Sequence, residues 1–167
     1  CAALALSDND RPIMWYGVPA LTPEQCFGMV KRLYDFTQEG YQIVTWNGLS
    51  FDFGVLARQS GATEQCAELA LSHVDMMVMG AFRKGYRLGL DAALKGAKLA
   101  SKQHNVILKD GTPLNEMHGG LAPELWAKGE TEAVLIYLKG DVEQTLKLAQ
   151  EWHRATVIGW TSKWLPK

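Results

Sequence analysis

Two aspartates and one tyrosine carry the clearest chemistry in this sequence. Asp52 ends the segment Asn47-Gly48-Leu49-Ser50-Phe51-Asp52, which follows the apolar run 42–46. Tyr137 and Asp141 are four residues apart in a helical pattern near the C-terminal end, so on a helix they share one face. Carboxylates are preferred ligands of Mg²⁺, and a well-placed hydroxyl can orient a water molecule. Asp52, Tyr137 and Asp141 are therefore the candidate catalytic residues, and the two aspartates are the candidate metal ligands.

This set of side chains suits the hydrolysis of a phosphodiester bond. Two divalent ions about 3.5–4 Å apart, Mg²⁺ or Mn²⁺, activate water and stabilise the charge on the leaving oxygen. An unperturbed phenol has a pKa of about 10, so Tyr137 would position the water rather than take its proton. The structural alternative is a core tyrosine beside a surface aspartate, with Asp52 merely capping a helix.

Local signals place these residues after a strand and on helices. Residues 1–6 and 12–16 predict a β-hairpin, and Thr22-Pro23-Glu24-Gln25 predicts the capped start of a helix that runs to about residue 38. A short buried strand is expected over 42–46. Further expectations are helices over 53–60, 63–71, 88–103 and 130–155, an extended piece over 73–77 and a loop over 105–120. This order predicts an α/β fold with a mixed sheet flanked by helices.

The composition fits one soluble domain over residues 1–167. The hydrophobic share is 47%, and no apolar run approaches the roughly 20 residues that cross a bilayer. The three cysteines, Cys1, Cys26 and Cys66, lack Cys-x-x-Cys spacing. This disfavours a disulfide framework or a zinc ribbon and suits a reducing compartment. We therefore expect a cytoplasmic protein without a membrane partner.

The basic residues are concentrated in one part of the chain. The net charge is −1, yet residues 80–109 hold seven basic and one acidic side chain. Such a segment suits phosphate binding, with Lys95, Lys98 and Lys102 as predicted contacts. The alternative is a solvated helix face. His104 and His118 lack the spacing of a zinc site, and we expect these loop histidines to be solvated.

The motifs together resemble the DEDD-type 3′–5′ exonucleases of the tyrosine subclass. Within that group the chain is most similar to the proofreading domains of family B DNA polymerases and their stand-alone relatives. The resemblance runs from the predicted hairpin to about residue 152, and its carriers are residues 46–53, 73–76 and 137–145. It implies a ribonuclease H-like fold and a substrate with a single-stranded 3′ end, above all DNA. It also implies a polymerase or another replication or repair protein as a partner.

The resemblance assigns a role to each candidate residue. Asp52 would serve the second metal ion, Asp141 the ion that activates the nucleophile, and Tyr137 would orient the water. The residues that would contact the 3′ end are Asn47, Gly48 and Phe51.

The sequence also predicts roles for two further residues. Phe51 would stack on a terminal base, which requires no particular base identity; the alternative is ordinary core packing. Asp75, in the segment 73–76, is expected to be structural, as a cap or a partner of nearby groups.

The first motif of that family, an Asp-x-Glu on the first, central strand, is missing from the sequence. Residues 1–6 resemble the inside of a strand, so we expect a piece of a longer domain that lacks the first strand. Asp8-Asn9-Asp10 lies in the predicted turn and is not expected to replace the motif. Two carboxylates hold two hard ions poorly, so this piece alone is predicted to be inactive or nearly so. The alternative function is a catalytically inactive nucleic-acid-binding module of the same fold.

Overall fold

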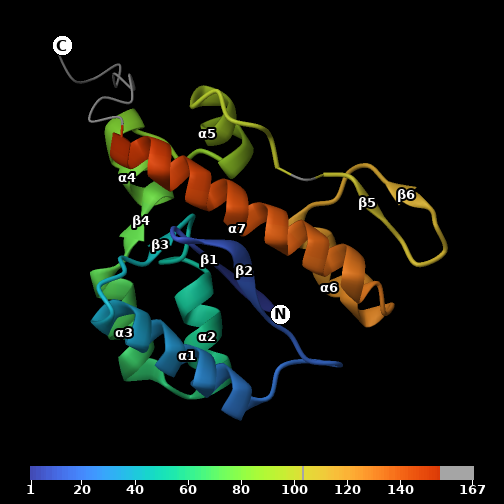
Figure 1. Ribbon diagram of the computed structural model, residues 1–167, viewed down its shortest axis with the longest axis horizontal. Coiled ribbons are helices and arrows are strands. Elements are labelled where there is room, and N and C mark those ends of the chain that lie inside the picture. Colours follow the sequence, from blue (N-terminus) through green and yellow to red (C-terminus); the bar gives the residue numbers. More distant parts are fainter. Residues whose placement is uncertain (103, 155–167) are drawn as a thin grey trace.

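A computed structural model describes residues 1–102 and 104–154 as a mixed α/β fold (Figure 1). Strands β1 (Ala2–Leu6) and β2 (Asn9–Trp15) form the predicted antiparallel hairpin. In the described part, two more pairs of short strands follow. The strands β3 (Val44–Thr45) and β4 (Val74–Asp75) are parallel, whereas β5 (Val106–Ile107) and β6 (Pro113–Leu114) are antiparallel. The α/β class is thus confirmed. The single mixed sheet that the sequence predicts is not found, because the strands of the described residues pair in three separate two-stranded sheets.

Helices make up most of the described chain, and several begin and end where the sequence predicts. Their bounds are α1 Pro23–Gln38, α2 Asp52–Ser60, α3 Thr63–Ser72, α4 Met76–Lys84, α5 Leu90–Gly96, α6 Ala122–Ala127 and α7 Thr131–Arg154, with a 3-10 turn at Gly119–Leu121. The predicted capping box starts α1, because Thr22 Oγ1 accepts from the Gln25 amide at 3.2 Å and Gln25 Oε1 accepts from the Thr22 amide at 2.8 Å. Gly61 ends α2 with a φ of 73°, a value that glycine adopts readily.

Several segments differ from the prediction. Strand β2 begins at Asn9, inside the predicted turn, and the buried strand expected over 42–46 is limited to β3, which is only partly buried. The extended piece 73–77 is limited to β4, and α4 begins at Met76 because the Asp75 side chain accepts from the amides of Met77 and Val78. The predicted helix 88–103 is helical only in α5. The predicted loop 105–120 contains the β5–β6 pair, which turns at Gly111 with a φ of 85°.

The hairpin β1–β2 lies between a group of three helices and the long helix α7 (Figure 1). On one side, Ala2 and Trp15 pack against the core of α1, α2 and α3. On the other side, α7 contacts both hairpin strands and β3. Leu148 of α7 joins a second core cluster with α5, and Val134 joins a third with β5. The middle of α7, which carries Asp141, therefore lies between two packed ends.

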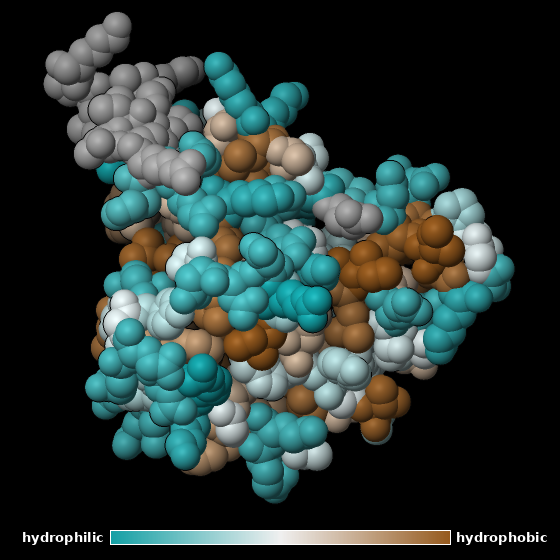
Figure 2. Space-filling model, in the orientation of Figure 1, coloured by the Kyte–Doolittle hydropathy of each residue, from teal (hydrophilic) through white to brown (hydrophobic). Residues whose placement is uncertain are grey.

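Hydrophilic side chains cover much of the face shown in Figure 2, with apolar groups near the β5–β6 pair, where Ile107 is exposed. Within residues 1–102 and 104–154, no helix has the length and apolar character needed to cross a membrane.

Candidate functional site

The first candidate motif, residues 47–52, begins in the turn after β3. Asp75 holds the backbone of this turn, because its two carboxylate oxygens accept from the amides of Asn47 and Leu49, each at 3.0 Å. Asn47 has a φ of 71°, which asparagine tolerates better than most residues. Gly48 donates its amide to Thr45 Oγ1, and a Cβ at Gly48 would meet that oxygen at 2.4 Å. The turn therefore requires the absence of a side chain at position 48.

Asp75 has the structural role that the sequence predicts. The side chain is only 6% exposed. Besides the turn amides, it accepts from the amides of Met77 at 3.0 Å and Val78 at 3.3 Å, which caps α4. One buried carboxylate thus joins the turn after β3 to the start of α4.

Asp52 and Phe51 extend outward from this turn. Asp52 is the first residue of α2, and its side chain is exposed. Partial removal of water by the surrounding protein raises the pKa of Asp52, and the negative charge of Asp75 adds to this effect. Phe51 is 62% exposed and Leu49 51% exposed. Core packing, the alternative for Phe51, is therefore wrong.

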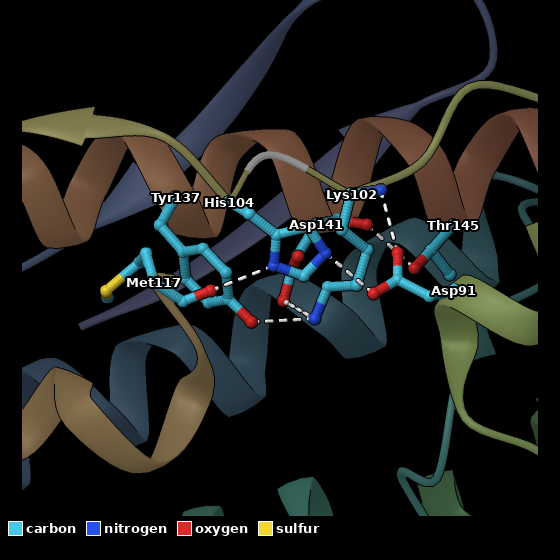
Figure 3. Close-up of polar contacts among 7 residues, drawn as sticks. All are labelled: Asp91, Lys102, His104, Met117, Tyr137, Asp141 and Thr145. Atoms are coloured by element: carbon cyan, nitrogen blue, oxygen red, sulfur yellow. Dashed lines mark hydrogen bonds and ion pairs between the residues drawn. The ribbon is translucent and has the colours of Figure 1, made fainter. Parts of the chain in front are cut away.

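The second motif lies on α7, where Tyr137 and Asp141 share a face as predicted (Figure 3). The Lys102 ammonium joins them, because its Nζ donates to the Tyr137 hydroxyl at 2.6 Å and lies 2.9 Å from Asp141 Oδ2. The Lys102 and Asp141 side chains are only 16% and 23% exposed. Lys102 is therefore a partly buried ion-pair partner, which corrects its predicted role as a phosphate contact on a basic surface. Lys95 and Lys98 are exposed, as that role requires.

Burial and charge act on the pKa of all three groups. Burial disfavours the Lys102 ammonium, but its hydrogen bonds to Tyr137 and Asp141 outweigh this and raise the pKa of Lys102. Burial raises the pKa of Tyr137 in spite of the nearby ammonium. Burial also raises the pKa of Asp141, although the hydrogen bond and the positive charge of Lys102 act in the opposite direction. A tyrosine with a raised pKa is a poor base, which fits a positioning role.

The segment that carries Lys102 is itself fixed by α5 and by residue 117. Asp91 Oδ1 accepts from the Lys102 amide at 2.9 Å, and Asp91 Oδ2 lies 2.7 Å from His104 Nε2. His104 Nδ1 lies 3.1 Å from the carbonyl oxygen of Met117. His104 is thus bound on both ring nitrogens, which corrects its prediction as a merely solvated histidine. His118 is exposed as predicted.

The described residues do not by themselves fit two divalent ions. Asp141 Oδ1 is buried and has no hydrogen-bond partner, so it is an oxygen that a cation would suit. The other oxygen, however, is taken by Lys102. Across residues 1–102 and 104–154, no group of three or more histidine, cysteine, aspartate or glutamate side chains gathers as a metal site. Within the described residues, therefore, neither Asp52 nor Asp141 belongs to a group of side chains that could hold a metal ion.

Comparison with models of protein families, with curated proteins and with solved structures finds no match to this chain. Function must therefore be inferred from the residues and their geometry. Sequence reasoning identified the motifs of Asp52 and Asp141 but missed the contacts of Lys102, Asp91 and His104. The one relevant signal was the excess of basic residues over 80–109.

Proposed function

We propose that this chain belongs to a ribonuclease H-like 3′–5′ exonuclease domain that acts on the 3′ end of single-stranded nucleic acid, DNA above all. The observation that carries this proposal is the common face of Tyr137 and Asp141 on α7, where both side chains bind one ammonium group. A tyrosine that positions water beside the aspartate would need this common face. The natural partner of such a domain is a polymerase or another replication or repair protein.

The turn after β3 supports a role in binding the substrate end. Phe51 presents an exposed ring immediately before Asp52, and Leu49 adds a second exposed apolar side chain. Stacking of a base on an aromatic ring contributes about 1–3 kcal/mol and does not depend on base identity. Asn47 and Gly48 fix the turn from which Phe51 extends, so they act on the substrate end through its geometry.

Hydrolysis with Mg²⁺ or Mn²⁺ would require carboxylates beyond Asp52 and Asp141. It would also require the Lys102 ammonium to leave Asp141 Oδ2, to which it is bound at 2.9 Å. The same contact favours a second candidate function, a nucleic-acid-binding module without catalysis. In such a module Lys102 would permanently replace a metal ion beside Asp141.

A comparison of linear and circular single-stranded DNA separates the two functions. The natural protein containing this chain is incubated with each substrate in Mg²⁺ and in Mn²⁺, and binding is measured in parallel by fluorescence anisotropy. An exonuclease shortens the linear strand and leaves the circle intact, because a circle has no 3′ end. Binding of the linear strand without degradation in either metal ion would instead establish the binding module. Cutting of the circle, or neither binding nor cutting, contradicts the exonuclease proposal.

A further inference from the structure

The residues around His104 form a small network that holds the backbone at Lys102 and at His104 (Figure 3). On one side, Asp91 of α5 binds the Lys102 amide and the His104 ring. On the other side, the His104 carbonyl accepts from the Met117 amide at 2.9 Å, while the Met117 carbonyl faces the His104 ring. The network therefore ties α5, the Lys102 segment and residue 117 together.

Both nitrogens of the His104 ring face hydrogen-bond acceptors. Nε2 lies 2.7 Å from an Asp91 carboxylate oxygen, and Nδ1 lies 3.1 Å from the Met117 carbonyl oxygen. A neutral imidazole has one N–H and can donate only one of these bonds, whereas the imidazolium donates both. The arrangement is therefore complete only when His104 carries its second proton.

The charged groups around the ring act in both directions. The Met117 carbonyl is the largest cause that raises the pKa of His104; Asp91 raises it further, and the positive charge of Lys102 opposes this. Asp141 and Tyr137 of α7 lie one contact further away, on the Lys102 ammonium. The protonated ring is thus favoured by its own neighbours, although its side chain remains 40% exposed.

The network connects to α7 through packing as well. Met117 is fully buried in the same core cluster as Ala133, Val134 and Tyr137. Lysine has a flexible four-carbon chain, so the ammonium reaches a fixed point only if its backbone is fixed. Here that backbone is attached to Asp91 at residue 102 and, through His104, to a residue packed beside Tyr137.

We infer that Asp91 and His104 are positioning residues that place the Lys102 ammonium on Tyr137 and Asp141, and that they do so when His104 is protonated. Loss of the His104 proton breaks one of the two ring contacts and loosens the Lys102 segment. The relevance of this device to catalysis or binding rests on the proposed function, whereas the network itself rests on the contacts above.

The sign of the pH dependence follows from the raised pKa of His104. The contribution of the network to stability is fully present below a pH of about 6.5, which is the pKa of a histidine in the unfolded chain. It is lost as the pH rises through the higher pKa of the folded state. His104→Ala therefore removes more stability in mild acid than in mild base.

The first measurement is an NMR titration of the histidine rings in the whole chain, without nucleic acid. The expected result is a His104 pKa above 6.5, with both ring nitrogens protonated at pH 5.5 and a lower pKa in Asp91→Asn. A His104 pKa at or below that of an unperturbed histidine, or no change in Asp91→Asn, would overturn the inference.

The second measurement is urea unfolding of His104→Ala, with His118→Ala as the matched control. His118 is also a loop histidine, but it is exposed. At pH 5.5 the unfolding equilibrium constant should rise about three- to fivefold in His104→Ala, as for a partly exposed ion pair. At pH 9 the effect of His104→Ala should be smaller, because the neutral ring donates only one of its two hydrogen bonds. His118→Ala should resemble the parent at both pH values. Equal changes in both variants, or a His104→Ala effect independent of pH, would reduce His104 to a packing role and overturn the inference.

A third readout reports on Lys102 itself. Protection of the Lys102 amide from hydrogen exchange should fall in His104→Ala and not in His118→Ala, because this amide binds Asp91. Unchanged protection of the Lys102 amide in His104→Ala would contradict the inference that His104 positions Lys102. None of these measurements uses nucleic acid. If the protein binds no single-stranded nucleic acid but gives the expected result in all three measurements, the proposed function is wrong and the inference about the network still holds.

Discussion

The ammonium of Lys102 lies 2.6 Å from the hydroxyl of Tyr137, although 35 residues separate them in sequence. The same ammonium is 4.9 Å from the centre of the Tyr137 ring and 2.9 Å from Asp141 Oδ2. The candidate catalytic face of α7 is thus neutralised by a residue from another segment. A cation that binds Asp141 Oδ2 must therefore displace Lys102, whereas Oδ1 has no hydrogen-bond partner.

Replacing Lys102 by methionine should destabilise the protein, because the Asp141 carboxylate then stays buried without a partner. We expect the free energy of unfolding to fall by about 2 kcal/mol, less than for a fully buried pair since both side chains retain some exposure. Urea denaturation measures this. Lys128→Met is the control, since the Lys128–Glu124 pair is well exposed and should matter little. Adding Asp141→Asn to Lys102→Met should restore part of the loss; no recovery would contradict the pairing.

Replacing Tyr137 by phenylalanine should slow cleavage of single-stranded DNA by about a hundredfold, because the water loses its orienting hydroxyl. The Tyr137→Phe substitution should lower the free energy of unfolding by about 1 kcal/mol, the contribution of one hydrogen bond. Tyr16→Phe is the control, since that ring is 55% exposed. Equal cleavage rates for the parent and Tyr137→Phe would refute the positioning role.

Replacing Phe51 by alanine should weaken binding of a single-stranded 3′ end while leaving stability nearly unchanged. Loss of one stacked base costs about 1–3 kcal/mol, or roughly 5- to 150-fold in affinity. Fluorescence anisotropy with a labelled oligonucleotide measures the change. Phe27→Ala provides the control, as Phe27 is a comparably exposed phenylalanine on α1. Similar affinities for the two variants would remove Phe51 from the binding site.

Replacing Asp75 by alanine should destabilise the protein by about 3 kcal/mol, because four backbone amides lose one buried acceptor group. Asp75→Asn keeps one acceptor oxygen and should lose less. Asp110→Ala is the control, since Asp110 is an exposed aspartate that binds the amide of Thr112. Thermal and urea unfolding measure both effects. If Asp75→Ala loses no more stability than Asp110→Ala, then the hydrogen bonds of Asp75 to the four backbone amides do not stabilise the fold as proposed.

Replacing Lys95 and Lys98 by glutamine should reduce the salt dependence of single-strand binding. Each phosphate contact contributes about 0.7 to the slope of log affinity against log salt, so the slope should fall by about 1.4. Affinity measured at several salt concentrations gives the slope. The control is the double variant Lys31→Gln and Lys128→Gln. It changes the net charge by the same amount, at two exposed sites outside the basic segment. The same slope in both double variants would mean that Lys95 and Lys98 are only solvated.

Local signals in the sequence predicted the parts of the fold that depend on short-range physics. The capping box at Thr22, the glycine at position 61 and the apolar spacing of α7 each act within a few residues. The start of α4 was missed because a run of methionines has no clear period. Only the contact of the Asp75 side chain with the Met77 and Val78 amides shows that a helix begins there.

The contacts of the candidate site depend on tertiary packing, which sequence spacing does not reveal. Tyr137 and Asp141 were predicted to share a face because one helix carries both. Lys102 reaches them from the segment after α5. That helix ends at Gly96, earlier than predicted, and the chain then turns at Lys98, which has a φ of 58°. The network of Asp91 and His104 likewise spans 13 residues without any helical or strand period.

The role of Asp141 in cleavage can be measured by following a 5′-labelled single strand of DNA on a sequencing gel. The natural protein containing this chain is compared with its Asp141→Ala variant in Mg²⁺ and in Mn²⁺. The parent should shorten the strand stepwise from its 3′ end, and the variant should leave it intact. Equal shortening by both proteins, or no shortening by either, would contradict an exonuclease that works through Asp141.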